Sequence, residues 1–371
     1  MIVGTKYCDC NNIEEINKII ESGEYAKLLD YDHFDGSQIN LPTLMIKSNY
    51  DVLQHVINNS IIDLEFNNDN YKYALIHLAC WYQTKEVIQL LIDEKANVNL
   101  ACQDSKWTPI HFACKHQTKE VIQLLINNKA DLNCESGSGL RPIHLACQYQ
   151  SKEVIQLLIN NNVDLNCKSR TGARPIHIAC QCQSKEVIQL LINNKVDLNC
   201  EGRNGAQPIH IACEYQTKEV IQLLINNKVD LNCEGINGAQ PIHLACHHQT
   251  KEVIQLLINN KADLNCETKS KTRPIHIACG RGQYSIIRLL MDNNVDLCYE
   301  SALGINPCKK IWMPEHHSIF DDKIRAIVEL LLLILKKINT PIIIVPKYIR
   351  YDIIRMFAFY QTYCVKPIDK W

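Results

Sequence analysis

A histidine that returns about every 33 residues constrains the fold of this chain more than any other feature of its sequence. The seven histidines are His77, His111, His144, His177, His210, His243 and His276. The first interval is 34 residues and the five that follow are 33 each. Self-similarity at a fixed period of this length is typical of a solenoid, in which each unit packs mainly on its neighbours. We therefore predict a repeat array, which also suits a chain of 371 residues, too long for one ordinary core.

Each repeat contains the signals of two helices and a turn. In the copy that starts near residue 141, Pro142 opens a short helix, at a position where its missing N–H costs nothing. Apolar residues then fall at i, i+3 and i+4 along 152–159, which is the pattern of a helix with one buried face. Asn162 ends this helix, and Gly172 marks a turn. We predict that every unit is a helix, a second helix and a hairpin finger.

The sequence Pro-Ile-His-Leu-Ala at 142–146 and its copies resemble the Thr-Pro-Leu-His-x-Ala signature of ankyrin repeats. This resemblance implies an all-α solenoid of paired helices with β-hairpin fingers, and a structural hydrogen-bonding role for each repeated histidine. Two departures stand out, because Thr108 alone keeps the signature threonine and the usual glycines are replaced, for instance by Gln150, Lys129 or Asn162. We expect each replacement to cost about 1 kcal/mol where the backbone must be left-handed.

Irregular copies flank the regular ones, as a solenoid requires when its ends face water. Lys309, for example, stands where the next repeated histidine would fall. We predict N-terminal capping helices in 1–35, a degenerate repeat in 36–66, seven regular repeats in 67–300, an altered final repeat with an insertion in 301–340, and a C-terminal helical capping segment in 341–371.

Composition narrows the environment of the protein. Most of the 19 cysteines recur at fixed points of the repeat, after Ala or after Leu-Asn, so we interpret them as free thiols packed in a reducing compartment. With 39 basic and 40 acidic residues, the net charge of -1 gives no general attraction to nucleic acid. The longest apolar run, 327–335, is too short for the roughly 20 residues of a membrane span. We therefore expect a cytoplasmic protein that binds neither nucleic acid nor a membrane.

No catalytic pattern is present in the sequence. It contains no phosphate-binding loop, no nucleophile elbow and no H-E-x-x-H helix. His-x-x-Cys pairs such as His77 and Cys80 contain zinc ligands, but successive pairs are a whole repeat apart and cannot converge on one ion. We therefore expect no enzyme activity, no metal site and no cofactor.

Comparison between copies indicates where function lies. Six copies of Lys-Glu-Val-Ile-Gln-Leu-Leu-Ile are identical, whereas the last turn of the first helix and the finger tip vary. In ankyrin proteins these two places line the groove and fingers that hold partners. The candidate partner-binding residues are Trp81, Tyr82, Trp107, His116, Tyr149, Arg170, Arg203, Tyr215, His248 and Arg281. The alternative is drift at exposed positions after recent duplication.

Two further expectations follow from these positions. The candidate aromatic residues lie outside the repeated core stripe, so we expect their replacement to leave folding intact. Arg141, Arg174, Lys269, Lys271 and Arg273 lie on or beside the fingers and, together with the two tip arginines, would form a basic ridge suited to an acidic peptide.

The leading functional hypothesis is a monomeric, non-enzymatic scaffold that binds a protein partner. The Asn-, Ile- and Lys-rich repeats resemble the ankyrin families of giant DNA viruses such as mimivirus, which implies a host protein partner in the host cell cytoplasm. The alternative hypothesis is an adaptor for ubiquitin ligation, because 346–357 is loosely similar to the F-box-like C-terminus of poxvirus ankyrin proteins. A competing interpretation of that segment is a capping helix with Ile349, Ile353 and Phe357 on one face.

Overall fold

The computed structural model describes residues 54, 73–82, 84–293, 295 and 301. Within them it contains fourteen α-helices, α5 to α18, and no β-strand. None of these helices is long and apolar enough to cross a membrane. The chain divides into two compact units, Met1–Arg203 and Asn204–Trp371. The predicted caps in 1–35 and 341–371, the degenerate repeat apart from residue 54, and the altered repeat apart from residue 301 lie outside the described residues.

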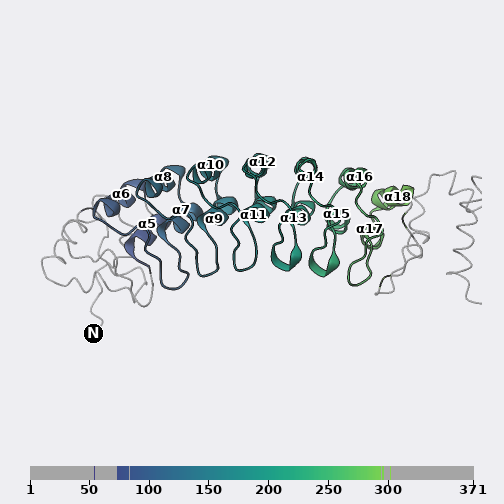
Figure 1. Cartoon of the computed structure of the whole chain (residues 1–371), viewed down its shortest axis with the longest axis horizontal. Coiled ribbons are helices and arrows are strands. Elements are labelled where there is room, and N and C mark those ends of the chain that lie inside the picture. Colours follow the sequence, from purple (N-terminus) through teal and green to yellow (C-terminus); the bar gives the residue numbers. More distant parts are fainter. Residues whose placement is uncertain (1–53, 55–72, 83, 294, 296–300, 302–371) are drawn as a thin grey trace, which may run out of the picture. The chain divides into compact units, whose positions relative to one another are not determined.

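The first unit contains four helix pairs. They are α5 (Leu75–Tyr82) with α6 (Lys85–Asp93), α7 (Pro109–His116) with α8 (Lys119–Asn127), α9 (Pro142–Tyr149) with α10 (Lys152–Asn160), and α11 (Pro175–Cys182) with α12 (Lys185–Asn193). Within this unit the first helices pack on one another in one row and the second helices in another, and the fingers extend from the side of the first helices (Figure 1). Within this unit, each described repeat therefore packs on its described neighbours.

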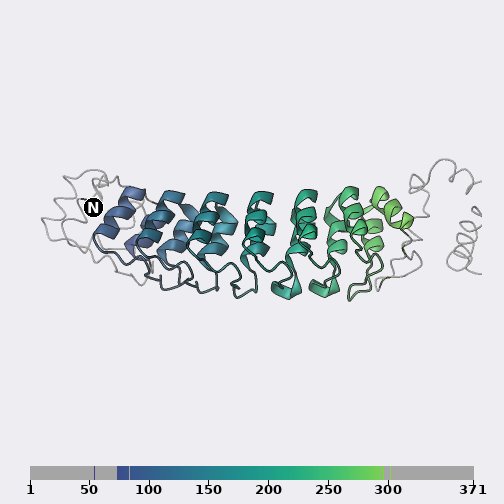
Figure 2. The same ribbon diagram turned by 45° about the horizontal axis from the view of Figure 1, so that its top comes forward.

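The second unit repeats the same pattern with three pairs. They are α13 (Pro208–Tyr215) with α14 (Lys218–Asn226), α15 (Pro241–His248) with α16 (Lys251–Asn259), and α17 (Pro274–Arg281) with α18 (Tyr284–Asp292). Figure 2 shows the two helices of each pair lying side by side. Short 3-10 turns form two finger tips, η1 (Arg203–Gly205) and η2 (Ile236–Gly238).

The core runs between the two helices of each pair. In the second repeat, Ile110 and Cys114 of α7 and Ile122 and Leu125 of α8 have no exposed surface. Burying a branched aliphatic side chain of this size stabilises the fold by about 1.5–3 kcal/mol. The octapeptide that is identical in six copies supplies this buried stripe, because Val, Ile, Leu and Leu fall at i, i+1, i+3 and i+4 of the second helix.

The repeated cysteines are packing residues, as the sequence predicted. The cysteines that follow Ala are buried throughout the described repeats, and Cys80, Cys114 and Cys147 have no exposed surface. Burial raises the pKa of these thiols far above the usual range. They are therefore small neutral core groups, without the thiolate character that reactive cysteines need.

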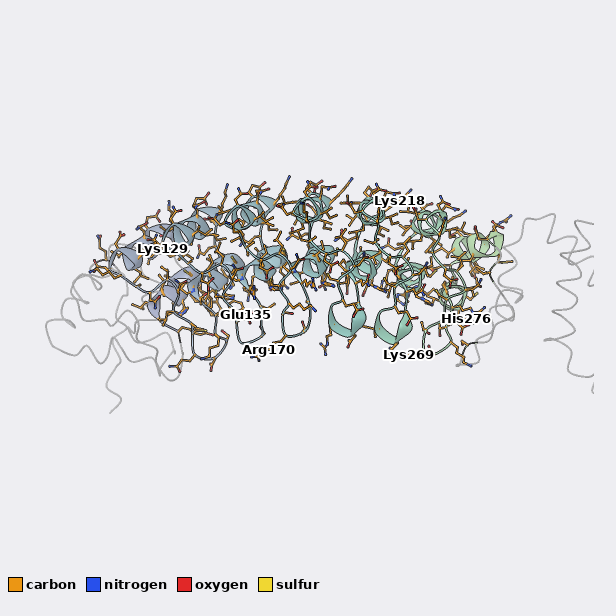
Figure 3. All side chains as sticks on the ribbon, viewed as in Figure 1. Lys129, Glu135, Arg170, Lys218, Lys269 and His276 are labelled. Atoms are coloured by element: carbon orange, nitrogen blue, oxygen red, sulfur yellow. The ribbon has the colours of Figure 1, made fainter. Side chains whose placement is uncertain are left out.

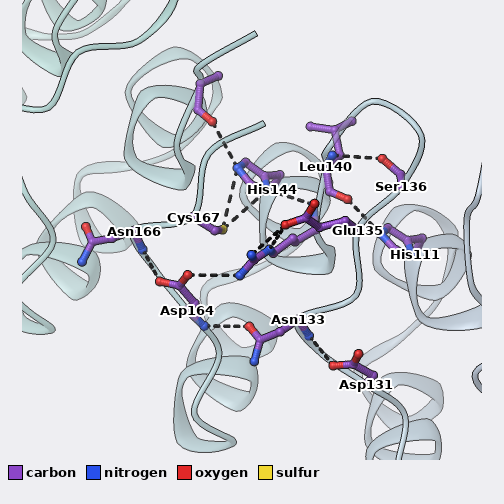
Figure 4. Close-up of polar contacts among 12 residues, drawn as sticks. His111, Asp131, Asn133, Glu135, Ser136, Leu140, His144, Asp164, Asn166 and Cys167 are labelled. Carbon is purple, nitrogen blue, oxygen red and sulfur yellow. Dashed lines mark hydrogen bonds and ion pairs between the residues drawn. The ribbon is translucent and has the colours of Figure 1, made fainter. Parts of the chain in front are cut away.

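Each repeated histidine links its own helix to the following finger. The backbone N–H of Thr108 donates to Nδ1 of His111 over 3.1 Å, and Nε2 of His111 donates to the carbonyl oxygen of Leu140 over 3.0 Å. His144 makes the same pair of bonds, with the N–H of Arg141 and the carbonyl oxygen of Ala173 (Figure 4). Because Nδ1 accepts while Nε2 donates, the imidazole is neutral. The structural role predicted for these histidines is confirmed.

Asparagine and aspartate side chains make a second series of links between repeats. The N–H of Asp131 donates to Oδ1 of Asn99, and the N–H of Asp164 donates to Oδ1 of Asn133, over 2.7 and 3.0 Å. Within one loop, the N–H of Asn133 donates to Oδ1 of Asp131 over 2.9 Å (Figure 4). Each asparagine therefore holds the loop of the next repeat in register with its own.

The fingers are hairpin loops without strands. Ser136 N–H donates to the carbonyl oxygen of Leu140 and closes one finger, and Ser169 closes the next finger in the same way. Neighbouring tips are joined by single bonds, such as the one from Arg170 N–H to the carbonyl oxygen of Ser138 over 3.0 Å. A β-ladder needs successive bonded pairs along two strands, and these fingers are too short to supply them. The predicted β-hairpin is present as a turn only.

The replaced glycines divide into two classes. Lys129 and Asn162 have φ values of 65° and 60°, so these non-glycine residues do stand in left-handed positions. The expectation for Gln150 was wrong, because its backbone is extended, with φ -108° and ψ 164°. Its side-chain amide donates to the carbonyl oxygens of Cys114 and Gln117 in the preceding repeat, over 3.1 and 3.2 Å. At this position, where ankyrin repeats usually have a turn glycine, the Gln150 side chain therefore bridges two repeats.

The buried histidines predict an acid-sensitive array. Burial lowers the pKa of His111 to about 4 and also lowers that of His77, His144, His210 and His243. The unfolded chain therefore binds more protons below about pH 6.5, and stability is lost as the pH falls from there toward 4. His111 alone accounts for about 3 kcal/mol over this window. Urea unfolding at pH 7.5, 6.0 and 5.0 measures the loss, and equal stability at all three would contradict the neutral imidazole network.

The hydrogen bonds of the Gln150 side chain predict that glycine at this position destabilises the protein. Replacing Gln150 by Gly should lower the free energy of unfolding by about 1–2 kcal/mol, because two hydrogen bonds are lost and the unfolded chain gains freedom. The exposed neighbour Gln148 of α9 provides the control, and Gln148→Ala should change stability little. Chemical denaturation compares the two variants. A more stable Gln150→Gly variant would show that the bridge contributes nothing.

Candidate partner-binding surface

The variable residues predicted to bind a partner lie where the first helices end. In the first unit, Trp81 and Tyr82 close α5, His116 closes α7 and Tyr149 closes α9. In the second unit, Tyr215, His248 and Arg281 are the last residues of α13, α15 and α17. Since the first helices of each unit pack in one row, these ends form one continuous edge within each unit.

The first unit gathers its aromatic side chains into a cluster. We define the aromatic cluster as Tyr73, Trp81, Tyr82, Trp107, Phe112 and His116. Tyr82 and His116 stack on Trp81, with ring centroids 5.0 and 5.5 Å from it. Trp107 meets Phe112 edge to face at 5.1 Å, and Tyr73 meets both Phe112 and Trp81. Of the candidates named from the sequence, Trp81, Tyr82 and His116 are therefore in contact, and Trp107 is joined to them through Phe112.

The two tryptophans are partly core residues. Trp81 and Trp107 are half-buried, and both contact Phe112, which is only 3% exposed. As predicted, both tryptophans lie outside the repeated stripe of the second helices, but they pack against the buried Phe112. One signal in the sequence pointed to this packing. Phe112 occupies a position at which the other copies have Leu or Ile, such as Leu145.

The tyrosines are the exposed part of this surface. Tyr82 and Tyr149 are 47% and 49% exposed. Between the repeats that carry them stands Lys115, whose Nζ lies 5.6 Å from the centroid of the Trp107 ring and 5.8 Å from that of Tyr149. These distances suit cation–π attraction. Sequence comparison did not single out Lys115, although it belongs to the same variable turn.

The finger residues do not form the predicted basic ridge. Arg141 pairs with Glu135 over 2.7 Å and with Asp164 over 3.1 Å, and Glu135 raises the pKa of this guanidinium (Figure 4). Arg174 pairs with Asp197 and Arg273 with Glu267 in the same manner, over 3.6 and 2.7 Å. Acidic groups of the loops therefore neutralise three of the expected cations.

The tip arginines differ from these paired ones. Arg170 and Arg203 are exposed, and Figure 3 shows Arg170 at the end of its finger. Lys269 is likewise exposed at a finger tip of the second unit (Figure 3). The positive charge that faces solvent on the fingers therefore lies at the tips and not along their bases.

The second unit carries a polar counterpart of the aromatic cluster. His247 Nδ1 and His248 Nε2 are 2.9 Å apart, and a guanidinium nitrogen of Arg281 lies 2.9 Å from His247 Nε2. Tyr215 is 53% exposed on α13. The structure thus brings His248 and Arg281 together through His247, a residue that the list of candidates omitted.

The described residues offer no site for bond-making chemistry. No group of three His, Cys, Asp or Glu side chains among them could hold a metal ion. Cys167 Sγ lies 3.9 Å from His144 Nδ1, a pairing that could in principle make a nucleophile. Burial raises the pKa of this thiol to about 12, so it stays protonated.

Half-buried tryptophans and exposed tyrosines predict mutational effects of different size. Trp81→Ala and Trp107→Ala should each lower the free energy of unfolding by about 2–4 kcal/mol, since both remove packing from Phe112. Tyr82→Ala and Tyr149→Ala should cost about 1 kcal/mol or less. Urea denaturation of the four variants measures this difference. Tryptophan variants as stable as the wild type would place those rings outside the core.

Comparison with known proteins agrees with this architecture. The family described as ankyrin repeats (three copies) matches residues 41–136, 76–169, 110–202, 143–235, 209–301 and 242–342. No curated protein matches the sequence. The crystal structure of the human ASB11 ankyrin repeat domain is similar, with a TM-score of 0.54 and 23% identity, over 60% of this chain and 99% of that chain. At this identity the likeness shows the fold alone. Because the family matches span most of its length, the chain belongs to the ankyrin repeat family.

Proposed function

We propose that this protein is a non-enzymatic scaffold that binds a partner protein along the ends of its first helices. Ankyrin repeats are generally protein–protein interaction modules. The observation that carries the proposal is the aromatic cluster, which holds Tyr82 at its exposed edge and is linked to Tyr149 through Lys115. Aromatic side chains with one buried and one exposed face are the residues that most often dominate binding energy at interfaces.

The geometry favours binding because the exposed rings are already held in place. Tyr82 stacks almost parallel on Trp81, with an interplanar angle of 7°, and Trp81 is itself fixed by Phe112. A side chain ordered before binding loses less conformational entropy when the partner arrives. The Lys115 amine adds a positive group beside the rings. A partner segment with apolar side chains and a nearby carboxylate would complement this surface.

Drift after duplication remains the competing explanation of the variable positions. Independent drift in each repeat would change single exposed residues without regard to their neighbours. Here residues from α5, α7 and the finger before α7 pack on one another, and Phe112 differs from its copies in step with Trp81 and Trp107. This coordination between repeats supports selection for one surface.

The cellular setting that we propose is the cytoplasm of a host cell. Buried, protonated thiols suit a reducing compartment, which supports a cytoplasmic location. The Asn-, Ile- and Lys-rich repeats resemble those of giant-virus ankyrin families. On that resemblance we propose that the protein is a monomer that binds a host protein. The adaptor role in ubiquitin ligation depends on residues 346–357, which lie outside the described residues.

The proposal predicts a selective loss of partner capture. The double variant Tyr82→Ala/Tyr149→Ala of the full chain should remain folded, with a loss of stability of no more than about 2 kcal/mol. It should lose a specific partner from cell lysate by at least about tenfold, since exposed aromatic anchors contribute most of an interface's energy. Quantitative mass spectrometry of the captured proteins measures the loss.

A matched control distinguishes this surface from the rest of the array. Gln89→Ala/Gln156→Ala changes the second helices of the same two repeats and leaves the aromatic cluster intact. It should capture the same partner as the wild type. Equal capture by the wild type and by both double variants would show that the partner does not bind at the ends of the first helices.

A further inference from the structure

In the second unit, three side chains at the ends of neighbouring first helices form an exposed hydrogen-bonded chain. We define the His–His–Arg chain as His247 and His248, which close α15, with Arg281, which closes α17. The guanidinium nitrogen of Arg281 and Nδ1 of His247 each lie 2.9 Å from their partner nitrogen. All three residues are exposed. The preceding variable turns have Gln148-Tyr149 and Gln181-Cys182 at these positions, so the chain belongs to this unit alone among the described repeats.

The direction of each hydrogen bond follows from the chemistry of arginine. A guanidinium always donates, so Nε2 of His247 must be an unprotonated acceptor. The proton of the neutral His247 ring is then on Nδ1, and it is donated to Nε2 of His248, which is an acceptor in turn. Both imidazoles are therefore neutral in the chain. A proton added at either Nε2 replaces a lone pair by an N–H and breaks the bond that ends there.

We propose that the His–His–Arg chain is a proton-gated binding site for a carboxylate-bearing segment of a partner protein. In the neutral state Arg281 is occupied by His247. When Nε2 of His247 takes up a proton, it repels the guanidinium, and Arg281 turns to solvent as a donor beside an imidazolium. A side chain with two carboxylate oxygens then finds convergent N–H donors where the neutral protein presented a closed chain.

Burial and the neighbouring charges determine the direction in which the pKa of His247 shifts. Burial, followed by the neighbouring Arg281 and His248, lowers the pKa of His247, while Glu214 on α13 opposes them. The helix α16, which also packs on α15, begins with Lys251 and Glu252, whose opposite charges are adjacent. His247 is therefore neutral at pH 7 and gains its charge on moderate acidification. Glu214 is the internal carboxylate with which the partner must compete.

A metal ion does not fit this site. Two imidazole nitrogens close together are potential ligands, but the Arg281 guanidinium lies beside one ring and repels a cation. No third His, Cys, Asp or Glu completes a metal-binding group within the described residues. An anionic ligand meets no such repulsion once the rings are charged. Carboxylates, which stay ionised down to about pH 5, are the protein groups that suit it.

This inference rests on the proposed function, since it assigns a partner chemistry to the corresponding ends of the first helices in the second unit. The aromatic cluster of the first unit would supply apolar contact whatever the pH. The His–His–Arg chain would add attraction to an acidic segment only in mildly acidic surroundings, in the manner of a histidine switch.

The protonation states can be tested without any ligand. Nitrogen-15 spectra of the histidine rings in the full chain at pH 7.5 should show His247 as the neutral tautomer with its proton on Nδ1. Arg281→Ala should raise the pKa of His247, because it removes an adjacent positive charge. A His247 ring with its proton on Nε2 at pH 7.5, or one indifferent to Arg281, would overturn the proposed chain.

Binding is tested with a labelled hexaglutamate peptide and a hexaglutamine peptide of the same length. Hexaglutamate should bind the full chain about five- to tenfold more tightly at pH 5.5 than at pH 7.5, the range expected for one or two added surface ion pairs. Hexaglutamine should show no change. His247→Gln/His248→Gln should abolish the pH effect and leave binding at pH 7.5 unaltered. Circular dichroism at pH 5.5 verifies that each protein is folded.

Two further variants decide the cause of any pH effect. Lys251→Gln removes a positive charge from the same repeat outside the chain, and it should retain the full effect. Tyr82→Ala/Tyr149→Ala should retain it as well, so failure of the aromatic surface and failure of the proton gate are separate outcomes. A pH effect that survives in the double histidine variant, or that is absent from the wild type, overturns the proposal.

Discussion

The neutral state of a buried imidazole, which recurs in the seven regular repeats that the structure describes, is the interaction on which the rest of the fold depends. His111 accepts from the N–H of Thr108 and donates to the carbonyl oxygen of the next finger, so one ring connects a helix start to the following repeat. A protonated ring has no acceptor for the first bond. The asparagine links between loops act in parallel, and together these contacts hold helices whose isolated stability would be marginal at eight or nine residues.

Because these contacts and the apolar stripe of the second helices hold the repeats together, the ends of the first helices can vary in sequence. The second helices are nearly identical because their apolar stripe is the common core, and a change there would disturb two interfaces at once. The first-helix ends contact neighbours only along one row, and side chains of different size are accommodated there. In the first unit Trp81 and Trp107 occupy this region and both pack on Phe112, while the exposed Tyr82 stacks on Trp81.

The two units share one arrangement of helices and fingers, but they carry different charged groups on their surfaces. Arg141, Arg174 and Arg273 are held by acidic residues of nearby loops, so the finger bases carry little net charge. Solvent-facing cations remain at tips such as Arg170 and, in the second unit, within a hydrogen-bonded chain with histidines. A net charge near zero is thus compatible with local sites of one sign, because acidic residues neutralise Arg141, Arg174 and Arg273 at the finger bases and leave the tips positive.

The sequence by itself determined the repeat, the order of two helices and a finger, the buried cysteines and the role of the histidines, because each depends on a pattern that recurs with the period of the fold. It could also locate the variable helix ends by comparison between copies. Only the tertiary structure decided that Gln150 is extended and bridges to Cys114 and Gln117, that Arg141 is paired, and that Trp81 is half-buried. These outcomes depend on distances between residues about one repeat apart in the chain, and on which of several neighbours a long side chain reaches. Residue type and spacing leave those distances open, whereas packing of one repeat on the next fixes them.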